Sequence, residues 1–193
     1  MNRRDFIKLT AIAGIGLSIP RNFDSFIAPA GASEKIDLAV AHGVSPSKIT
    51  RAAIDAMGGM KKFVSKGDIV VVKPNIAWDR TPEQAGNTNP EVVGVVVQMC
   101  YEAGAKKVKV FDRPVNDPRR CYVQSGIADA AKAAGADVSY IDERKFKEMD
   151  IKGEVLKSWP LYTEIFEADK VINIPIAKHH GLAKLTMSMK NWM

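Results

Sequence analysis

The stretch Asp68-Ile-Val-Val-Val-Lys73, which is closed by Pro74, decides the fold of this chain. Its β-branched residues form one continuous apolar run, without alternation between apolar and polar positions. Such a run is typical of a strand that is buried on both faces of a parallel sheet, and proline ends the strand because it cannot donate to the hydrogen-bond ladder. The sequence therefore predicts a central parallel strand and, with it, an α/β protein.

Helices and short apolar strands alternate on both sides of this run. Asn89 and Pro90 are residue types preferred at the start of a helix, and Gly104 is the type preferred at its end. The pattern predicts strands at 36–41, 68–73, 107–111, 138–141 and 170–174, and helices after Ser45, after Asn89, over 120–134 and over 185–193, with a short strand pair and a short helix within 142–169. This alternation predicts a three-layer α/β sandwich with a mostly parallel sheet. The fold is Rossmann-like, but the chain lacks the G-x-G-x-x-G fingerprint of a dinucleotide site.

The first 32 residues are typical of a twin-arginine (Tat) export signal. Arg3 and Arg4 are adjacent, an apolar run covers 9–19, and small residues around Ala30 suit a cleavage site. The apolar run is shorter than the roughly 20 residues that span a bilayer. We therefore predict a signal at 1–32, recognised by the Tat translocase, and an α/β domain at 33–193. The protein is expected in the periplasm or associated with a membrane outside the cytoplasm, and an uncleaved leader that holds it at the membrane remains an alternative.

Composition narrows the function classes. The formal net charge is +6, but the lysines are dispersed and few aromatic residues lie among them, which favours small anionic ligands over nucleic acid. The two cysteines, Cys100 and Cys121, form no C-x-x-C pair, so the chain lacks the ligands of an iron–sulfur cluster. Walker A, G-x-S-x-G and H-E-x-x-H motifs are also missing from the sequence, and nucleotide hydrolysis and a serine hydrolase are therefore unsupported.

Polar side chains follow the predicted strands at their carboxyl ends. Right-handed crossovers bring these ends to one edge of a parallel sheet, where ligands usually bind. Lysine and arginine can hold a carboxylate or phosphate there, asparagine can orient it, and the start of a helix can bind an anion, although helix capping explains Asn87-Thr88-Asn89 equally well. The candidate ligand-binding residues are Lys73, Asn75, Asn87, Thr88, Arg113, Lys178, Lys190 and Asn191.

Acid–base and metal chemistry have their own candidates at the same edge. Asp112 follows a predicted strand and could act as a base or a ligand, and His180 could transfer protons near neutral pH. These two are the predicted catalytic residues. His42, His179 and His180 are the predicted ligands of a divalent metal, although two adjacent histidines rarely bind one ion, so one of His179 and His180 is expected to act.

Five motifs occur in an order that resembles the Domain of Unknown Function 362 family. They are Val70-Val-Val-Lys-Pro-Asn75, Asn87-Thr-Asn-Pro-Glu-Val-Val93, Ala103-Gly-Ala-Lys-Lys-Val108, Val171-Ile-Asn-Ile-Pro175 with Lys178 and His180, and Leu185-Thr-Met-Ser-Met-Lys-Asn191. The resemblance covers about residues 36–193 and implies no settled activity. It implies that Lys73, Asn75, Asn87, Thr88, Lys178, His180, Lys190 and Asn191 are recurring polar positions. Since the last motif usually continues into a glycine and a further portion in that family, this chain is expected to be the front part of a longer protein.

Three functions follow from these observations. The first is an enzyme, assisted by a metal, that acts on a small anionic substrate. The second is a binding or accessory protein without catalysis. The third comes from the resemblance, because some members of the family carry ferredoxin-like iron–sulfur modules: an electron-transfer accessory with a redox partner protein, whose cluster lies outside this segment.

Overall fold

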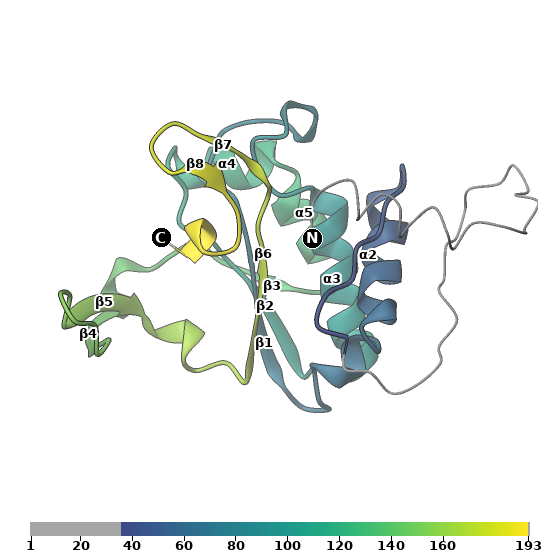
Figure 1. The fold of residues 1–193 in the computed structure, drawn as a ribbon, viewed down its shortest axis with the longest axis horizontal. Helices are drawn as coiled ribbons and strands as arrows, with labels where there is room; N and C mark the ends of the chain where they lie inside the picture. Colours follow the sequence, from purple (N-terminus) through teal and green to yellow (C-terminus); the bar gives the residue numbers. More distant parts are fainter. Residues whose placement is uncertain (1–35, 193) are drawn as a thin grey trace, which may run out of the picture. The chain divides into compact units, whose positions relative to one another are not determined.

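The computed structural model describes residues 36–192, which form an α/β domain around a four-stranded parallel sheet. The strands are β1 (Ile69–Pro74), β2 (Lys107–Val110), β3 (Asp137–Val138) and β6 (Lys170–Ile174). They lie in the order β3-β2-β1-β6, and every neighbouring pair is parallel, with Val71 opposite Lys109 on one side and Val171 on the other (Figure 1). The valine run thus forms an inner strand, as its composition predicts.

Helices cover one face of this sheet. They are α2 (Pro46–Ala56), α3 (Pro90–Ala103) and α5 (Ile127–Ala133), with α2 on the outer side of α3 (Figure 1). Val70 and Val72 point to this face and join Val93 and Val97 of α3 in the main core, where all four are fully buried. Burial of apolar surface of this kind stabilises the domain at about 25 cal/mol per Å².

A hairpin and a short 3-10 helix pack on the other face. They are β4 (Phe146–Asp150), β5 (Ser158–Tyr162) and η4 (Thr163–Ile165). Val71, which points away from the helices, joins Phe111 and Tyr162 in a second core cluster, and the two aromatic rings meet edge to face at 5.2 Å. The α/β class, the parallel sheet and the three layers are confirmed, with this hairpin layer in place of long helices.

The remaining elements are short, and they lie in the connections between the main strands and helices. They are α4 (Pro118–Gln124), β7 (Lys178–His180), β8 (Lys184–Thr186), η1 (Met60–Lys62), η2 (Pro82–Gln84), η3 (Glu143–Lys145) and η5 (Lys190–Trp192). Between residues 36 and 192, no helix is both long and apolar enough to cross a membrane.

The predicted helix signals at the start and end of α3 are confirmed. The side chain of Asn89 accepts a hydrogen bond from the Glu91 amide at 2.9 Å, and Pro90 occupies the first turn. Gly104 ends the helix with φ 105°, a left-handed conformation that a side chain would disfavour.

Three predicted elements are corrected by the structure. Residues 36–41 form no strand, because Leu38 and Val40 are exposed and no burial holds them in a sheet. The predicted helix 120–134 is two helices, since Gly126 adopts φ 69° between α4 and α5. Over its described residues, 185–192, the predicted helix 185–193 is instead the end of strand β8 followed by η5, because β8 pairs antiparallel with β7.

Glu164 is the buried acid of the hairpin layer, and its ionisation should contribute to stability. Its carboxylate accepts hydrogen bonds from Lys145 at 2.5 Å and Lys109 at 3.0 Å. Burial alone would raise the pKa of Glu164, but these two lysines outweigh it and hold the pKa below its usual value. Because the folded-state pKa is lowered, the stabilisation is present above the unfolded-state pKa and is lost as the pH falls through the folded-state value.

Replacing Glu164 with glutamine is therefore expected to cost about 1–3 kcal/mol of unfolding free energy at pH 7. The difference between wild type and Glu164→Gln should shrink below about pH 4 in urea unfolding series. Glu143→Gln is the matched control, because Glu143 forms an exposed ion pair with Arg113 and should change stability by less than about 1 kcal/mol. A Glu164→Gln cost that stays the same from pH 7 to pH 3 would contradict the assignment.

Candidate functional site

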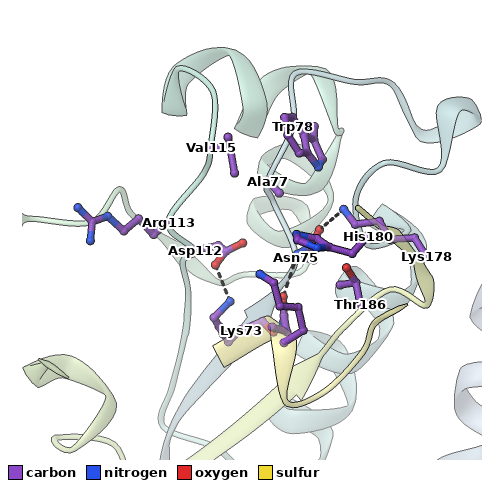
Figure 2. A pocket seen from close by; sticks show the side chains of 12 residues that line it. Lys73, Asn75, Ala77, Trp78, Asp112, Arg113, Val115, Lys178, His180 and Thr186 are labelled. Atoms are coloured by element: carbon purple, nitrogen blue, oxygen red, sulfur yellow. Dashed lines mark hydrogen bonds and ion pairs between the residues drawn. The ribbon is translucent and has the colours of Figure 1, made fainter. Parts of the chain in front are cut away.

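A pocket lies at the carboxyl edge of the sheet, at the point where the strand order reverses. The chain leaves β1 for β2 on one side, whereas β6 pairs with β1 on the other, and crevices at such positions commonly bind ligands in open α/β sheets. Residues from the loops after β1 and β2 and from β7, β8 and η5 meet here (Figure 2). The lining residues are Lys73, Asn75, Ala77, Trp78, Asp112, Arg113, Val115, Lys178, His180, Thr186, Lys190 and Asn191.

Lys73 and Asp112 form a nearly buried ion pair on one side of the pocket. Lys73 Nζ donates to Asp112 Oδ1 at 2.6 Å, and the amide of Ile76 donates to Asp112 Oδ2 at 2.6 Å. Both carboxylate oxygens therefore already have a strong partner. Asp112 neutralises Lys73 and fixes the turn after β1, and this geometry fits a positioning role better than the predicted role of a base or a metal ligand.

Tyr122 of α4 fixes the backbone beneath this ion pair. Its hydroxyl accepts from the Asp112 amide at 2.8 Å and lies 3.0 Å from the Ser139 carbonyl oxygen. Burial is the main cause of the raised pKa of Tyr122, so the hydroxyl stays protonated and able to donate. Tyr122 could not be identified from the sequence, because one tyrosine on a short helix carries no recognisable signal.

Asn75 and Thr88 join the ends of the two strands beside the pocket. Thr88 Oγ1 accepts from the Asn75 amide at 2.8 Å and donates to the Ile174 carbonyl at 2.7 Å. Asn75 Nδ2 donates in turn to Asn191 Oδ1 at 3.0 Å, and Asn191 Nδ2 donates to Asn173 Oδ1 at 2.8 Å. The structure thus brings Asn75, Thr88 and Asn191 together as predicted, but it uses most of their polar atoms to hold the strand ends and η5 in place.

Asn87 and Arg113 are predicted to bind a ligand, but in the structure their side chains contact other groups of the protein. Asn87 accepts from the Trp78 amide at 2.9 Å and donates to the Trp78 carbonyl at 2.8 Å, so both ends of its side-chain amide hold the loop after β1. Arg113 points away from the pocket (Figure 2), where it pairs with Glu143 at 3.0 Å and lies over the Phe146 ring at 5.4 Å. Its guanidinium group is therefore held outside the site.

Lys178 and Lys190 supply the positive charge that remains in the pocket. Lys178 Nζ donates to Asn75 Oδ1 at 2.9 Å and to the Gly86 carbonyl. Burial lowers the pKa of Lys178, and the nearby charge of Lys190 lowers it further against the opposing effect of Asp112. Across residues 36–192, neither Lys178 nor Lys190 forms an ion pair with a carboxylate. These two predicted residues therefore make the site electropositive.

The three histidines do not converge. Side chains alternate along β7, so Lys178 and His180 share the pocket side whereas His179 is exposed on the other. His180 Nδ1 accepts from the Ala183 amide at 3.0 Å, which leaves the proton of a neutral imidazole on Nε2. His42 is exposed in the segment before α2 and does not line the pocket. Within the described part of the chain, no three His, Cys, Asp or Glu side chains are grouped to hold a metal ion, and Cys100 and Cys121 are buried and free.

Thr186 of β8 is a further pocket residue that the sequence did not point to. Its side chain is buried, and its hydroxyl oxygen has no hydrogen-bond partner in the described structure. Figure 2 shows Thr186 beside Lys178 and His180. An unpartnered buried hydroxyl costs free energy, so a polar ligand atom at this position would be stabilising.

Comparison with known proteins gives a family and one distant relative. The model of a family described as a domain of unknown function (DUF362) matches residues 70–193. The thylakoid-associated protein sll1697 of Synechocystis sp. is 30% identical over 141 residues, which are 73% of this chain and 43% of that protein. The chain thus spans less than half of this relative's length. No solved structure matches the chain significantly.

Proposed function

We propose that this chain, which belongs to the DUF362 family, binds a small oxyanion in the pocket at the carboxyl edge of its sheet. One observation carries the proposal: Lys178 and Lys190 both line the pocket, and neither has a carboxylate partner in the part of the chain described. Among residues 36–192, Asp112 is the only acidic residue that lines the pocket, and it is already engaged by Lys73.

A bound anion would satisfy the groups that the pocket leaves unpaired. Burial disfavours the charged form of Lys178, as its lowered pKa indicates, and a neighbouring carboxylate or phosphate oxygen would offset that cost. The Thr186 hydroxyl could donate to the same anion.

His180 is the pocket residue that is placed to transfer a proton to or from a ligand. Its Nδ1 atom is held by the Ala183 amide, so Nε2 remains to exchange a proton with a ligand in the pocket. An imidazole can both accept and donate a proton, which suits general acid–base catalysis. The enzyme hypothesis therefore places proton transfer on His180 and assigns Asp112 to the positioning of Lys73.

The anion proposal predicts that binding affinity for an anion falls when the charge of Lys190 is removed. Isothermal titration of the full chain with inorganic phosphate and with acetate, at constant ionic strength, should show one site. Lys190→Met should weaken binding about two- to fivefold, the range of an exposed charge pair. Lys61→Met removes the same charge from exposed η1 and should leave the affinity unchanged. Equal losses in both variants would show that only net charge matters and would remove the proposed site.

We also propose that the protein is exported through the Tat translocase. Arg3 and Arg4 lie outside the described residues, so their sequence pattern alone supports it. A thylakoid-associated relative is compatible with a location at a membrane.

The export proposal predicts that replacing Arg3 and Arg4 together with lysine stops translocation, because the pathway recognises the arginine pair. Full-length protein should then accumulate inside a bacterial host with an intact Tat translocase, as measured by cell fractionation. Lys8→Arg is the matched control. Unchanged export of the double variant would rule out this route.

A further inference from the structure

The pocket has an apolar wall opposite its positive charge. Ala77 and Trp78 come from the loop after β1, and Val115 comes from the loop after β2. Trp78 is 38% exposed and Val115 is 67% exposed, so two large apolar side chains remain open to solvent beside the lysines. Figure 2 shows Trp78 and Val115 on one side of the pocket and Lys178 and Thr186 on the other.

This apolar wall is held in place by hydrogen bonds to its backbone. Asn87, which is buried, binds both the amide and the carbonyl of Trp78. The Ala77 carbonyl accepts from the Val115 amide at 2.9 Å, which ties the loop after β1 to the loop after β2. Since the backbone on both sides is fixed, a ligand that contacts Trp78 does not have to order these loops first.

We infer that the anion bound here carries a planar apolar body, as an aromatic carboxylate does, with its charged group at Lys178 and Lys190 and its ring against Trp78 and Val115. The inference rests on the proposed function and adds the class of ligand to it. A bare phosphate or acetate would contact only the polar half of the pocket, whereas an aromatic carboxylate would also remove the exposed apolar surface of the wall from water. Aromatic pairs add affinity beyond that of buried area.

Three carboxylates of graded shape test this inference by isothermal titration of the full chain: acetate, cyclohexanecarboxylate and benzoate. Benzoate should bind about tenfold more tightly than acetate, with cyclohexanecarboxylate between them. Trp78→Leu should weaken benzoate binding more than acetate binding, so that the preference for benzoate falls to less than about threefold, and Trp78→Phe should retain much of the preference. Trp159→Leu is the matched control, because Trp159 is exposed on β5 and does not line the pocket.

Three other outcomes would overturn the inference. Two of them would leave the proposed function standing. If acetate and benzoate bind equally well to the wild type, the anion site stands and the aromatic ligand class is wrong. If Trp78→Leu weakens acetate and benzoate by the same factor, Trp78 acts through the fold of its loop and does not contact the ligand. If none of the three carboxylates binds, the proposed function fails together with the inference.

Discussion

Replacing Lys178 with methionine is expected to weaken the binding of inorganic phosphate about ten- to a hundredfold, more than any other single change in the pocket. A hydrogen bond to a charged group contributes about 1.5–3 kcal/mol, which corresponds to this range. Lys178 is better shielded from water than an ordinary surface lysine, and Asn75 and Gly86 hold its ammonium group in place. Methionine preserves much of the length and apolar character of the side chain, so the variant should fold.

The pH dependence of binding gives a second readout for the same variant. The ammonium form binds the anion, and the pKa of Lys178 is lowered by burial and by the charge of Lys190. Affinity should therefore decline with rising pH before the region near pH 10.4 where an ordinary lysine titrates. Lys178→Met should lose this part of the profile, and Lys61→Met should keep it. If Lys178→Met binds phosphate with wild-type affinity across the profile, Lys178 is not a ligand of the anion.

Removing the carboxylate of Asp112 is expected to destabilise the domain by about 3–5 kcal/mol, the cost of leaving a buried charge without its partner. Asp112→Ala leaves the Lys73 ammonium group unpaired and the Ile76 amide without its acceptor. Urea unfolding of wild type and variant measures the difference.

The double variant Lys73→Met, Asp112→Ala distinguishes the ion pair from simple loss of packing. Because it removes the unpaired cation as well, it should recover part of the lost stability. A single Asp112→Ala variant within about 0.5 kcal/mol of wild type would contradict the positioning role, since only surface substitutions usually fall in that range.

The sheet could be predicted because its signals are local. The valine run from 70 to 72, the cap at Asn89 and the glycine at 104 each specify a conformation that the surrounding fold accepts. The strand prediction for 36–41 was wrong because an apolar run is typical of a strand, but a strand also needs a neighbouring strand with which to pair. The C-terminal segment misled because its helical spacing is overridden by the pairing of β8 with β7.

The position of the candidate pocket at the carboxyl edge could also be predicted, since parallel strands bring the loops after them to one edge of the sheet. The roles of its residues could not, because each role depends on which partner lies within reach. Asp112 lies close to Lys73, Arg113 close to Glu143 and Asn87 close to the Trp78 backbone, and no spacing in the sequence reveals these contacts. The distinction between His179 and His180 follows from the alternation of side chains along β7, which the sequence analysis did not predict as a strand.

An NMR titration of the nitrogen-15-labelled full chain with acetate, at constant ionic strength, tests the anion site most directly. The proposed site predicts that the largest amide shift changes cluster at residues 73–78, 112–115 and 178–191, which contain the residues that line the pocket, and that Lys178→Met abolishes them. Shift changes confined to residues outside these three segments, or a titration with no shift changes at all, would contradict the account.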